Sequence, residues 1–222
     1  MASPSEKLQR DLYGPSMFEV TLGAVLSICL GGILAAGYLA TQPVETVRVL
    51  PRELDPDKTY YVLGSARNSL GKGWLRKKQM LMEPGAATIQ LGEDELNTWL
   101  VSSKTQADRV HQGGLIEAQT INFRIADDTL QVALPCRVSI AGFNRAVLIQ
   151  TRGGFVLSGT SFTYLPDEVM VGGLAAHRLP LIGGFVAGRM AAMYDAPEDL
   201  LKAWSTLSNV EVVGDQLNLV RN

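Results

Sequence analysis

Few side chains in this sequence have the type and spacing that catalysis needs. The stretch "SLGK" places Ser69 three residues before Lys72, which is the spacing of serine and lysine in enzymes that are acylated on serine. The accompanying Ser-Asp-Asn and Lys-Thr-Gly motifs are absent, and glycines flank Lys72 where a helix would be needed. Such a short match arises often by chance, so it does not predict an active site.

Histidine and cysteine are too few for a zinc site or a disulfide framework. The chain has His111, His177, Cys29 and Cys136. Structural zinc takes four such ligands at short spacings, and two cysteines do not make a framework. Both cysteines lie in apolar surroundings and are predicted to be small buried side chains. We predict no cofactor, no metal and no catalytic residue. The chain is not expected to be an enzyme unless scattered residues come together.

Three consecutive acidic residues at 93–95, in "GEDELNTWL", are another candidate for a metal or catalytic site. Neighbouring residues on a helix point in different directions, which disfavours a shared ion. Acidic side chains are instead stabilised at a helix N-terminus by the helix dipole. The pattern therefore predicts a strand at 87–91, a break at Gly92 and a helix that begins with the acidic residues. Leu96 and Trp99 fall on one face of this helix.

Composition limits the class of partner. The 222 residues include 20 Lys plus Arg and 22 Asp plus Glu, so the formal net charge is -2. A nucleic-acid-binding protein normally has a basic excess, so we expect no nucleic-acid partner. The length suits one domain with an appendage.

The appendage is the apolar run from Met17 to Ala40, in which Glu19 is the single charged residue. About 20 apolar residues suffice for a helix to cross a bilayer. A cleaved signal peptide is the alternative interpretation, but the run is long for one and "AAGYLA" is a weak cleavage site. We therefore predict an uncleaved single-pass anchor, with membrane lipids as its partners.

The anchor divides the chain into a short cytoplasmic tail, a transmembrane helix, a linker and an extracytoplasmic domain, predicted at residues 1–16, 17–40, 41–58 and 59–222. The linker assignment depends on three prolines amid mixed charge. Lys7 and Arg10 precede the helix, but three basic residues also follow it by residue 58, so charge does not decide the orientation.

A basic cluster surrounds Trp74 near the start of the domain. Its members are Lys72, Arg76, Lys77 and Lys78. Basic residues with a tryptophan, close in sequence to an anchor, are predicted to contact anionic lipid headgroups. The alternative is a solvated helix face with Trp74 packed inward.

From Leu115 the apolar residues recur with a period of two, as at Ile121, Phe123 and Ile125, which predicts strands. One face of a strand at 130–140 carries Leu130, Val132, Leu134, Cys136, Val138 and Ile140. "RAVLIQTR" and "GFVLSGTSFTYLP" predict two more strands, with a bulge near Gly159. Pro135 indicates an edge strand or a local irregularity. Short connections favour an antiparallel meander with one buried face.

The stretch "HRLPLIGGFVAGRMAAMY" at 177–194 is too interrupted to be a second membrane crossing, and it lacks a phosphate-loop pattern. Gly183 and Gly184 are predicted to hinge into a helix. The candidate surface for an apolar ligand or a partner is Ile182, Phe185, Val186, Met190 and Met193. These side chains either line an apolar pocket or belong to an ordinary core.

A second helix is predicted to bury Leu200, Leu201, Trp204 and Leu207, and "VEVVGDQLNLV" predicts a closing strand, turn and strand. The expected fold is therefore α+β: an N-terminal transmembrane helix, then a curved antiparallel meander packed with two or three helices.

This order of features resembles the YpmS-like family of single-pass extracytoplasmic proteins over roughly residues 88–220. The similar features are the anchor, "EDELNTWL", the meander, "RLPLIGG" and the closing strands. The resemblance implies a domain outside the cytoplasm, at a bacterial inner membrane and facing the periplasm. It brings no catalytic residues. The architecture of this family is also distantly similar to that of lipid-binding domains in which a curved sheet wraps helices around an apolar tunnel.

The expected function is a membrane-anchored extracytoplasmic interaction or scaffolding domain, with an envelope protein as partner, in the manner of an accessory subunit of a membrane complex. The alternative is a module that binds a lipid or another hydrophobic ligand in an apolar groove between the sheet and the helix at 185–194.

Overall fold

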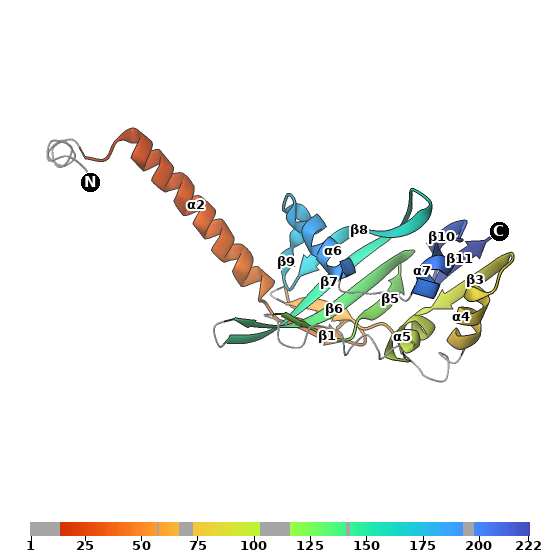
Figure 1. Cartoon of the computed structure of the whole chain (residues 1–222). Helices are drawn as coiled ribbons and strands as arrows, with labels where there is room; N and C mark the ends of the chain where they lie inside the picture. Colours follow the sequence, from red (N-terminus) through yellow and green to blue (C-terminus); the bar gives the residue numbers. More distant parts are fainter. Residues whose placement is uncertain (1–13, 57, 67–72, 103–115, 141–142, 193–197) are drawn as a thin grey trace. The chain divides into compact units, whose positions relative to one another are not determined.

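The computed structural model describes residues 14–56, 58–66, 73–102, 116–140, 143–192 and 198–222. The chain forms two compact units, Met1–Leu39 and Ala40–Asn222. The first contains an apolar helix, and the second, called the folded unit below, contains antiparallel sheets and a few helices (Figure 1). The predicted α+β fold class is confirmed.

The helices are α2 (Met17–Ala40), α4 (Trp74–Met82), α5 (Glu93–Ser102), α6 (Ile182–Ala192) and α7 (Glu198–Trp204), with a short 3-10 helix η1 (Ala176–Arg178). The strands are β1 (Val44–Val47), β2 (Thr59–Val62), β3 (Ala87–Gly92), β4 (Ile116–Ala118), β5 (Asn122–Ala126), β6 (Thr129–Ile140), β7 (Phe143–Ser158), β8 (Ser161–Val171), β9 (Leu174–Ala175), β10 (Asn209–Val213) and β11 (Gln216–Arg221).

Helix α2 begins with a capping box. The amide of Ser16 donates to Glu19 Oε2 at 3.0 Å, and the amide of Glu19 donates to Ser16 Oγ at 3.2 Å. The hydroxyls of Thr21 and Ser27 donate to carbonyls four residues earlier, so neither needs water. Among the described residues, this is the one helix long and apolar enough to cross a membrane. It is compatible with a single-pass anchor, although a signal sequence has the same features.

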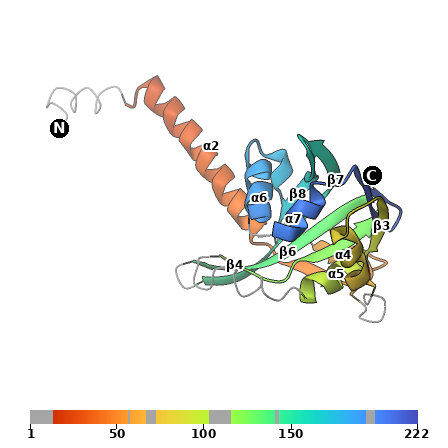
Figure 2. The same cartoon turned by 45° about the vertical axis from the view of Figure 1, so that its right-hand side comes forward.

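The larger sheet has the strand order β4-β6-β7-β8-β9, and β5 also pairs with β6. All of these pairings are antiparallel, as the meander predicts. Figures 1 and 2 show the long strands β6 to β8 as a curved surface with α6 and α7 on the same side of it. A second antiparallel sheet, β10-β11-β3, contains the predicted closing strands.

The main core lies on the predicted face of β6. Leu130, Val132, Leu134 and Cys136 are buried there, together with apolar residues of β3, β11 and the helices. The opposite face of the sheet is also covered at one place. Tyr61 on β2 packs there against Ala133 and Leu148, with Val44 of β1 beside them. The prediction of one buried face therefore misses a small second core.

That second core also changes the interpretation of the predicted linker at 41–58. Val44–Val47 form β1, which pairs in parallel with β2. The expected linker therefore contributes a strand to the folded unit. The mixture of prolines and charges in this segment carries no signal for β1, because the pairing joins residues about 15 positions apart.

Strand β7 differs from the prediction, because it runs without a break through Gly153 and Gly154. The register shift is opposite Gly153, and not near Gly159: Arg152 pairs with Glu168, whereas Gly153 pairs with Pro166. Asp167 is the extra residue of this bulge. A Cβ at Gly153 would lie 2.6 Å from the Cα of Pro166, so the bulge requires glycine there.

Gly159 instead lies in a two-residue turn between Ser158 and Ser161, with a φ of 64° that favours glycine. Phe155 and Tyr164 pair across this hairpin. The change of alternation around Gly159 is therefore the normal consequence of a two-residue turn, and the predicted bulge at this position is wrong.

Pro135 lies in a central strand, because β6 pairs with β7 on one side and with β4 and β5 on the other. The predicted edge position is therefore wrong, and the predicted irregularity is present. β4 ends opposite Cys136, β5 begins opposite Ala133, and Pro135 faces the gap between them. The carbonyl of Pro135 accepts from the amide of Gln119 at 2.7 Å. The missing amide of proline coincides with the break in the neighbouring strand.

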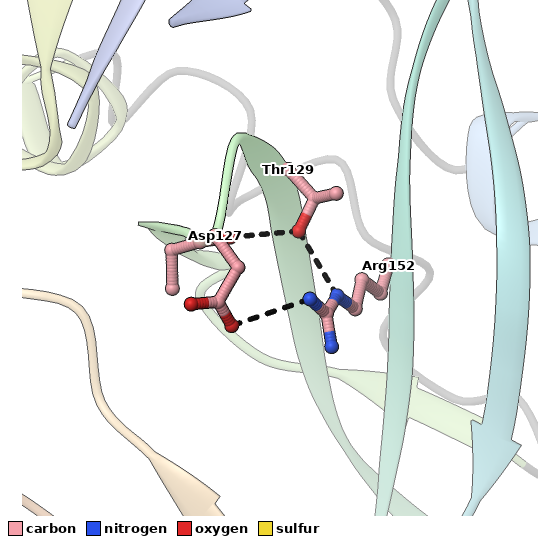
Figure 3. A network of polar contacts seen from close by, with 4 residues as sticks. Asp127, Thr129 and Arg152 are labelled. Carbon is pink, nitrogen blue, oxygen red and sulfur yellow. Dashed lines mark hydrogen bonds and ion pairs between the residues drawn. The ribbon is translucent and has the colours of Figure 1, made fainter. Parts of the chain in front are cut away.

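The β5–β6 turn consists of Asp127 and Asp128, both with positive φ. The side chain of Arg152 on β7 contacts this hairpin: its Nη2 lies 3.3 Å from Asp127 Oδ2 and its Nε donates to Thr129 Oγ1 at 3.0 Å (Figure 3). Asp128 Oδ1 accepts from the amide of Gly214 at 2.6 Å. Asp128 thus links the turns of the two sheets.

Candidate interaction surfaces

The first candidate surface is on α4, where the sequence predicts a basic cluster. Trp74 stacks on Trp99 of α5, with ring centroids 6.2 Å apart and planes within 12°. Arg76 is exposed and Lys78 is half-buried. Lys72, together with Ser69 of the "SLGK" match, lies outside the described residues.

Lys77 points to α5 instead of to solvent. Its Nζ lies 2.6 Å from Glu95 Oε2, and both side chains are partly buried. The same carboxylate oxygen accepts from the amide of Gly92 at 3.1 Å. A partly buried pair with an additional hydrogen bond is better held than an exposed one. The charge of Lys77 therefore joins α4 to α5, which leaves Arg76 and Lys78 as the basic residues of this surface in the described part of the chain.

The other end of α4 is capped by Arg221 from β11. Its guanidinium donates to the carbonyls of Met80 at 3.2 Å, Leu81 at 2.8 Å and Gly85 at 2.5 Å. Cations are favourable at helix C-termini, where the last carbonyls have no partners within the helix. Sequence reasoning missed this residue, since the alternation of "QLNLVR" identifies Arg221 only as a position on the buried face of β11.

Helix α5 is held in place by the buried side chain of Asn97. Its Nδ2 donates to the carbonyls of Phe123 at 2.7 Å and Ser65 at 2.9 Å, and its Oδ1 accepts from the amide of Phe123 at 2.8 Å. One side chain thus satisfies backbone groups on β5 and on the segment after β2.

Glu93 extends the same attachment. Its Oε2 accepts from the amide of Ser65 at 2.9 Å, and its Oε1 accepts from the amide of Ile125 at 2.8 Å. The prediction that the acidic residues begin a helix is confirmed. In addition, Glu93 and Glu95 each bind groups far away in the sequence, which the dipole argument does not predict. Carboxylates that bind backbone amides and a lysine are structural anchors.

A second amide group completes this polar network. Asn122 Oδ1 accepts from the hydroxyl of Tyr61 at 2.8 Å and from the amide of Gly64 at 2.9 Å. Burial raises the pKa of Tyr61 well above its usual value, so the phenol stays protonated and donates. The segment 61–65, β5 and α5 are therefore one rigid assembly.

Two other groups that could have carried chemistry, one buried and one partly buried, are held neutral. Burial raises the pKa of the Cys136 thiol to about 11 and that of the Tyr164 phenol to about 12. Cys136 is a buried residue of β6, as predicted for a small core side chain, whereas Cys29 is exposed on α2, so its predicted burial is wrong. In the described residues, no group of three His, Cys, Asp or Glu side chains lies close enough to hold a metal ion. His111 is outside those residues.

The second candidate surface is at the start of α6. Leu181, Phe185 and Ile182 are 91%, 67% and 42% exposed. We call these three residues the apolar cap. Phe185 has the guanidinium of Arg189 over its ring, 5.8 Å from the centroid.

The remaining predicted residues of α6 face the protein. Met190 is buried in the main core and Val186 is half-buried. Gly183, on the same side of the helix, is also buried. Ile182 instead lies with Phe185 on the outer side of the helix. Met193 lies outside the described residues. The predicted burial of Leu201 on α7 is wrong: Leu201 is 55% exposed, while Ala203 takes the buried position beside Leu200, Trp204 and Leu207.

Replacing Met190 with tryptophan tests whether α6 covers a filled core or a ligand pocket. For a filled core we expect a loss of about 1–3 kcal/mol of unfolding free energy from overpacking. Denaturant unfolding of the variant measures this loss, and Phe185→Trp on the exposed side of the same helix is the matched control with little expected change. An unfolding free energy unchanged by Met190→Trp would instead indicate unfilled space at this position.

Comparisons of the chain with protein-family models, curated proteins and solved structures find no match. The resemblance to the YpmS-like family therefore stays a prediction from sequence, and inferences about function depend on the two surfaces.

Proposed function

We propose that this chain is a single-pass membrane protein whose folded unit is an interaction domain outside the cytoplasm, an accessory subunit that holds an envelope protein partner. The observation that carries the proposal is the surface formed by Trp74, Leu75, Arg76 and Trp99, called the α4–α5 platform below. Leu75 is 61% exposed, and Arg76 is exposed beside it.

The composition of the platform fits a protein partner. Tryptophan and arginine are the residues most enriched at interface hot spots, and an exposed leucine adds apolar area. Lys77, which the sequence predicts to contact lipid headgroups, forms an ion pair with Glu95. We infer that the partner presents an apolar patch with acidic groups near Arg76 and Lys78.

The rigidity of the platform supports the same proposal. Association is more favourable when the binding surface is already ordered, since fewer side chains lose freedom. Here the Trp74–Trp99 stack, the Lys77–Glu95 pair and the cap from Arg221 hold α4 in one position. This arrangement is typical of a surface that docks without rearrangement.

Site-specific photo-crosslinking in membranes of the native host tests the platform. A photo-reactive amino acid at Leu75 is expected to give a discrete adduct at several-fold higher yield than one at the exposed Glu211 of β10. Arg76→Glu in the Leu75 variant should remove the adduct by placing like charges together. Equal yields at the two positions, or an adduct that survives Arg76→Glu, would contradict the proposal.

The alternative function, lipid binding between the sheet and the helix at 185–194, requires Val186 and Met190 to face a ligand. Met190 packs with the main core. The unfolding measurement on Met190→Trp therefore also decides whether a lipid-binding assay is warranted.

A further inference from the structure

The apolar cap is exposed at an energetic cost that the folded unit does not recover by packing. Leu181, its most exposed member, also has a φ of 68°. Bulky side chains rarely adopt this left-handed backbone conformation, which glycine and asparagine accept more readily. An exposed leucine side chain on a strained backbone does not stabilise the folded unit. This combination indicates that the side chain contacts something outside the folded unit.

The position of the cap relative to the end of α2 indicates that use. The last residue of α2, Ala40, is also the first residue of the folded unit. Its carbonyl carbon would lie 2.9 Å from a Cβ at Gly172, so the two backbones are in close contact. Gly172 is in the β8–β9 turn, and its amide donates to the carbonyl of Leu148 at 2.9 Å. Within the folded unit, Ala40 is therefore packed against this turn.

The β8–β9 turn leads directly to the cap. Val171 pairs with Leu174, and η1 follows β9 without a gap. Gly183 packs on η1, since a Cβ there would lie 2.9 Å from the Cα of His177. Leu181 is six positions after Ala175 in the chain, a reach of at most about 20 Å. The chain therefore places Leu181 no farther than about 20 Å from β9, which follows the turn that contacts Ala40.

We propose that the apolar cap inserts into the interfacial layer of the bilayer that α2 spans. This inference rests on the proposed membrane anchoring, but it is independent of the α4–α5 platform. If α2 crosses a membrane, Ala40 lies at the bilayer surface, and the neighbouring cap meets the boundary of headgroups and acyl chains. Leucine, isoleucine and phenylalanine are the side chains that amphipathic segments bury in this layer.

The charges around the cap show which force dominates. Arg178 and Arg189 are exposed nearby, and Arg189 covers the ring of Phe185. Asp167 and Glu168 are exposed on β8, the strand that contacts η1. Cations and anions balance, so attraction to anionic lipid is weak and apolar insertion carries the contact. The contact is therefore expected to persist in high salt and on neutral phosphatidylcholine.

A second attachment of the folded unit to the bilayer would limit its rotation about Ala40. A single helix with one connection leaves this rotation free, whereas an inserted cap sets which side of the unit faces the bilayer. The surface available to a partner would then be the same in every copy.

Fluorescence quenching of the full chain in phosphatidylcholine vesicles tests the insertion. A nitrobenzoxadiazole label is placed on one cysteine at a time: native Cys29 in α2, Phe185→Cys in the cap, or Leu201→Cys as another exposed apolar position, on α7, with 55% exposure against 67% for Phe185. The last two variants carry Cys29→Ala, and Cys136 stays unlabelled because it is buried. Doxyl-labelled lipid reports contact with acyl chains, and iodide reports contact with water.

We expect doxyl lipid to quench the label at 29 strongly. It should also quench the label at 185 several-fold more than the label at 201. Iodide should give the opposite order and quench the label at 201 more than the label at 185. Equal quenching at 185 and 201, with strong quenching at 29, would overturn the insertion and leave the anchor intact. Weak doxyl quenching at 29 would overturn the anchor itself. Protection at 185 that depends on protein density and not on doxyl lipid would indicate a second copy as occupant, and would also overturn the proposal.

Leu181→Asn in the Phe185→Cys chain separates insertion from folding. Asparagine accepts the left-handed backbone and removes the apolar side chain. We expect doxyl quenching at 185 to fall at least two-fold while the melting temperature stays unchanged or rises. Ile182→Ser, which keeps Leu181, should reduce quenching less. Unchanged quenching in both variants would contradict a role for these side chains in the contact.

Discussion

Replacing Asn97 with alanine is expected to lower the free energy of unfolding by about 3–5 kcal/mol, because it leaves three partly buried backbone groups without their partner. The amide and carbonyl of Phe123 and the carbonyl of Ser65 all bind the Asn97 side chain. Each unsatisfied buried group costs about 1–3 kcal/mol. Urea or guanidinium unfolding, followed by circular dichroism, measures the loss.

Asn218→Ala is the matched control for this substitution. Asn218 Oδ1 is buried on β11 without a hydrogen-bond partner among the described residues. Its removal is expected to change the unfolding free energy by less than about 1 kcal/mol. Similar losses for the two variants would show that asparagine burial, and not the bonds of Asn97, determines the effect.

Gly64→Ala is expected to cost about 3 kcal/mol or more, because the space for a side chain is occupied by backbone. A Cβ at this position would overlap the carbonyl oxygen of Phe123 and lie 2.8 Å from its carbonyl carbon. Backbone cannot move aside without breaking the bonds of Asn97 and Asn122 to the same segments. Thermal unfolding should show a large decrease in melting temperature.

Gly92→Ala is the control for the loss of a glycine as such. Position 92 ends β3 and has no positive φ, and a Cβ there would meet no atom of the described residues within 4 Å beyond its own chain neighbours. We expect a change of less than about 1 kcal/mol there, since alanine also restricts the unfolded chain. A mild effect of Gly64→Ala would mean that the segment at 64–65 can shift away from β5, contrary to the close packing described above.

Both substitutions also bear on the α4–α5 platform. Asn97 holds α5 on β5, and Gly64 lets the neighbouring segment that Asn97 also binds pack against β5. Helix α5 carries Trp99, on which Trp74 stacks. A variant that weakens the buried network is therefore expected to disturb partner binding even though neither residue is on the surface. The polar network and the platform form one structure, in which stability provides the preorganisation that binding requires.

The sequence by itself determined the elements whose signals are local. The apolar run of α2 needs only its own length and composition. Gly92 followed by acidic residues places the end of β3 and the start of α5, and alternation places Leu130, Val132 and Leu134 on one face of β6. The closing hairpin of β10 and β11 follows from the same alternation around Gly214. In these cases the forces act between residues close in sequence, so the pattern is sufficient.

Tertiary structure decided the features that need partners distant in sequence. β1 exists because β2 pairs with it, the bulge at Asp167 exists because Gly153 approaches Pro166, and Leu201 is exposed because Ala203 faces the core. The same holds for the candidate surfaces. A lysine in a basic cluster and an arginine in a closing strand carry no local sign that Lys77 meets Glu95 or that Arg221 caps α4. Hydrogen bonds and ion pairs depend on angstrom-scale placement, which only the packed chain provides.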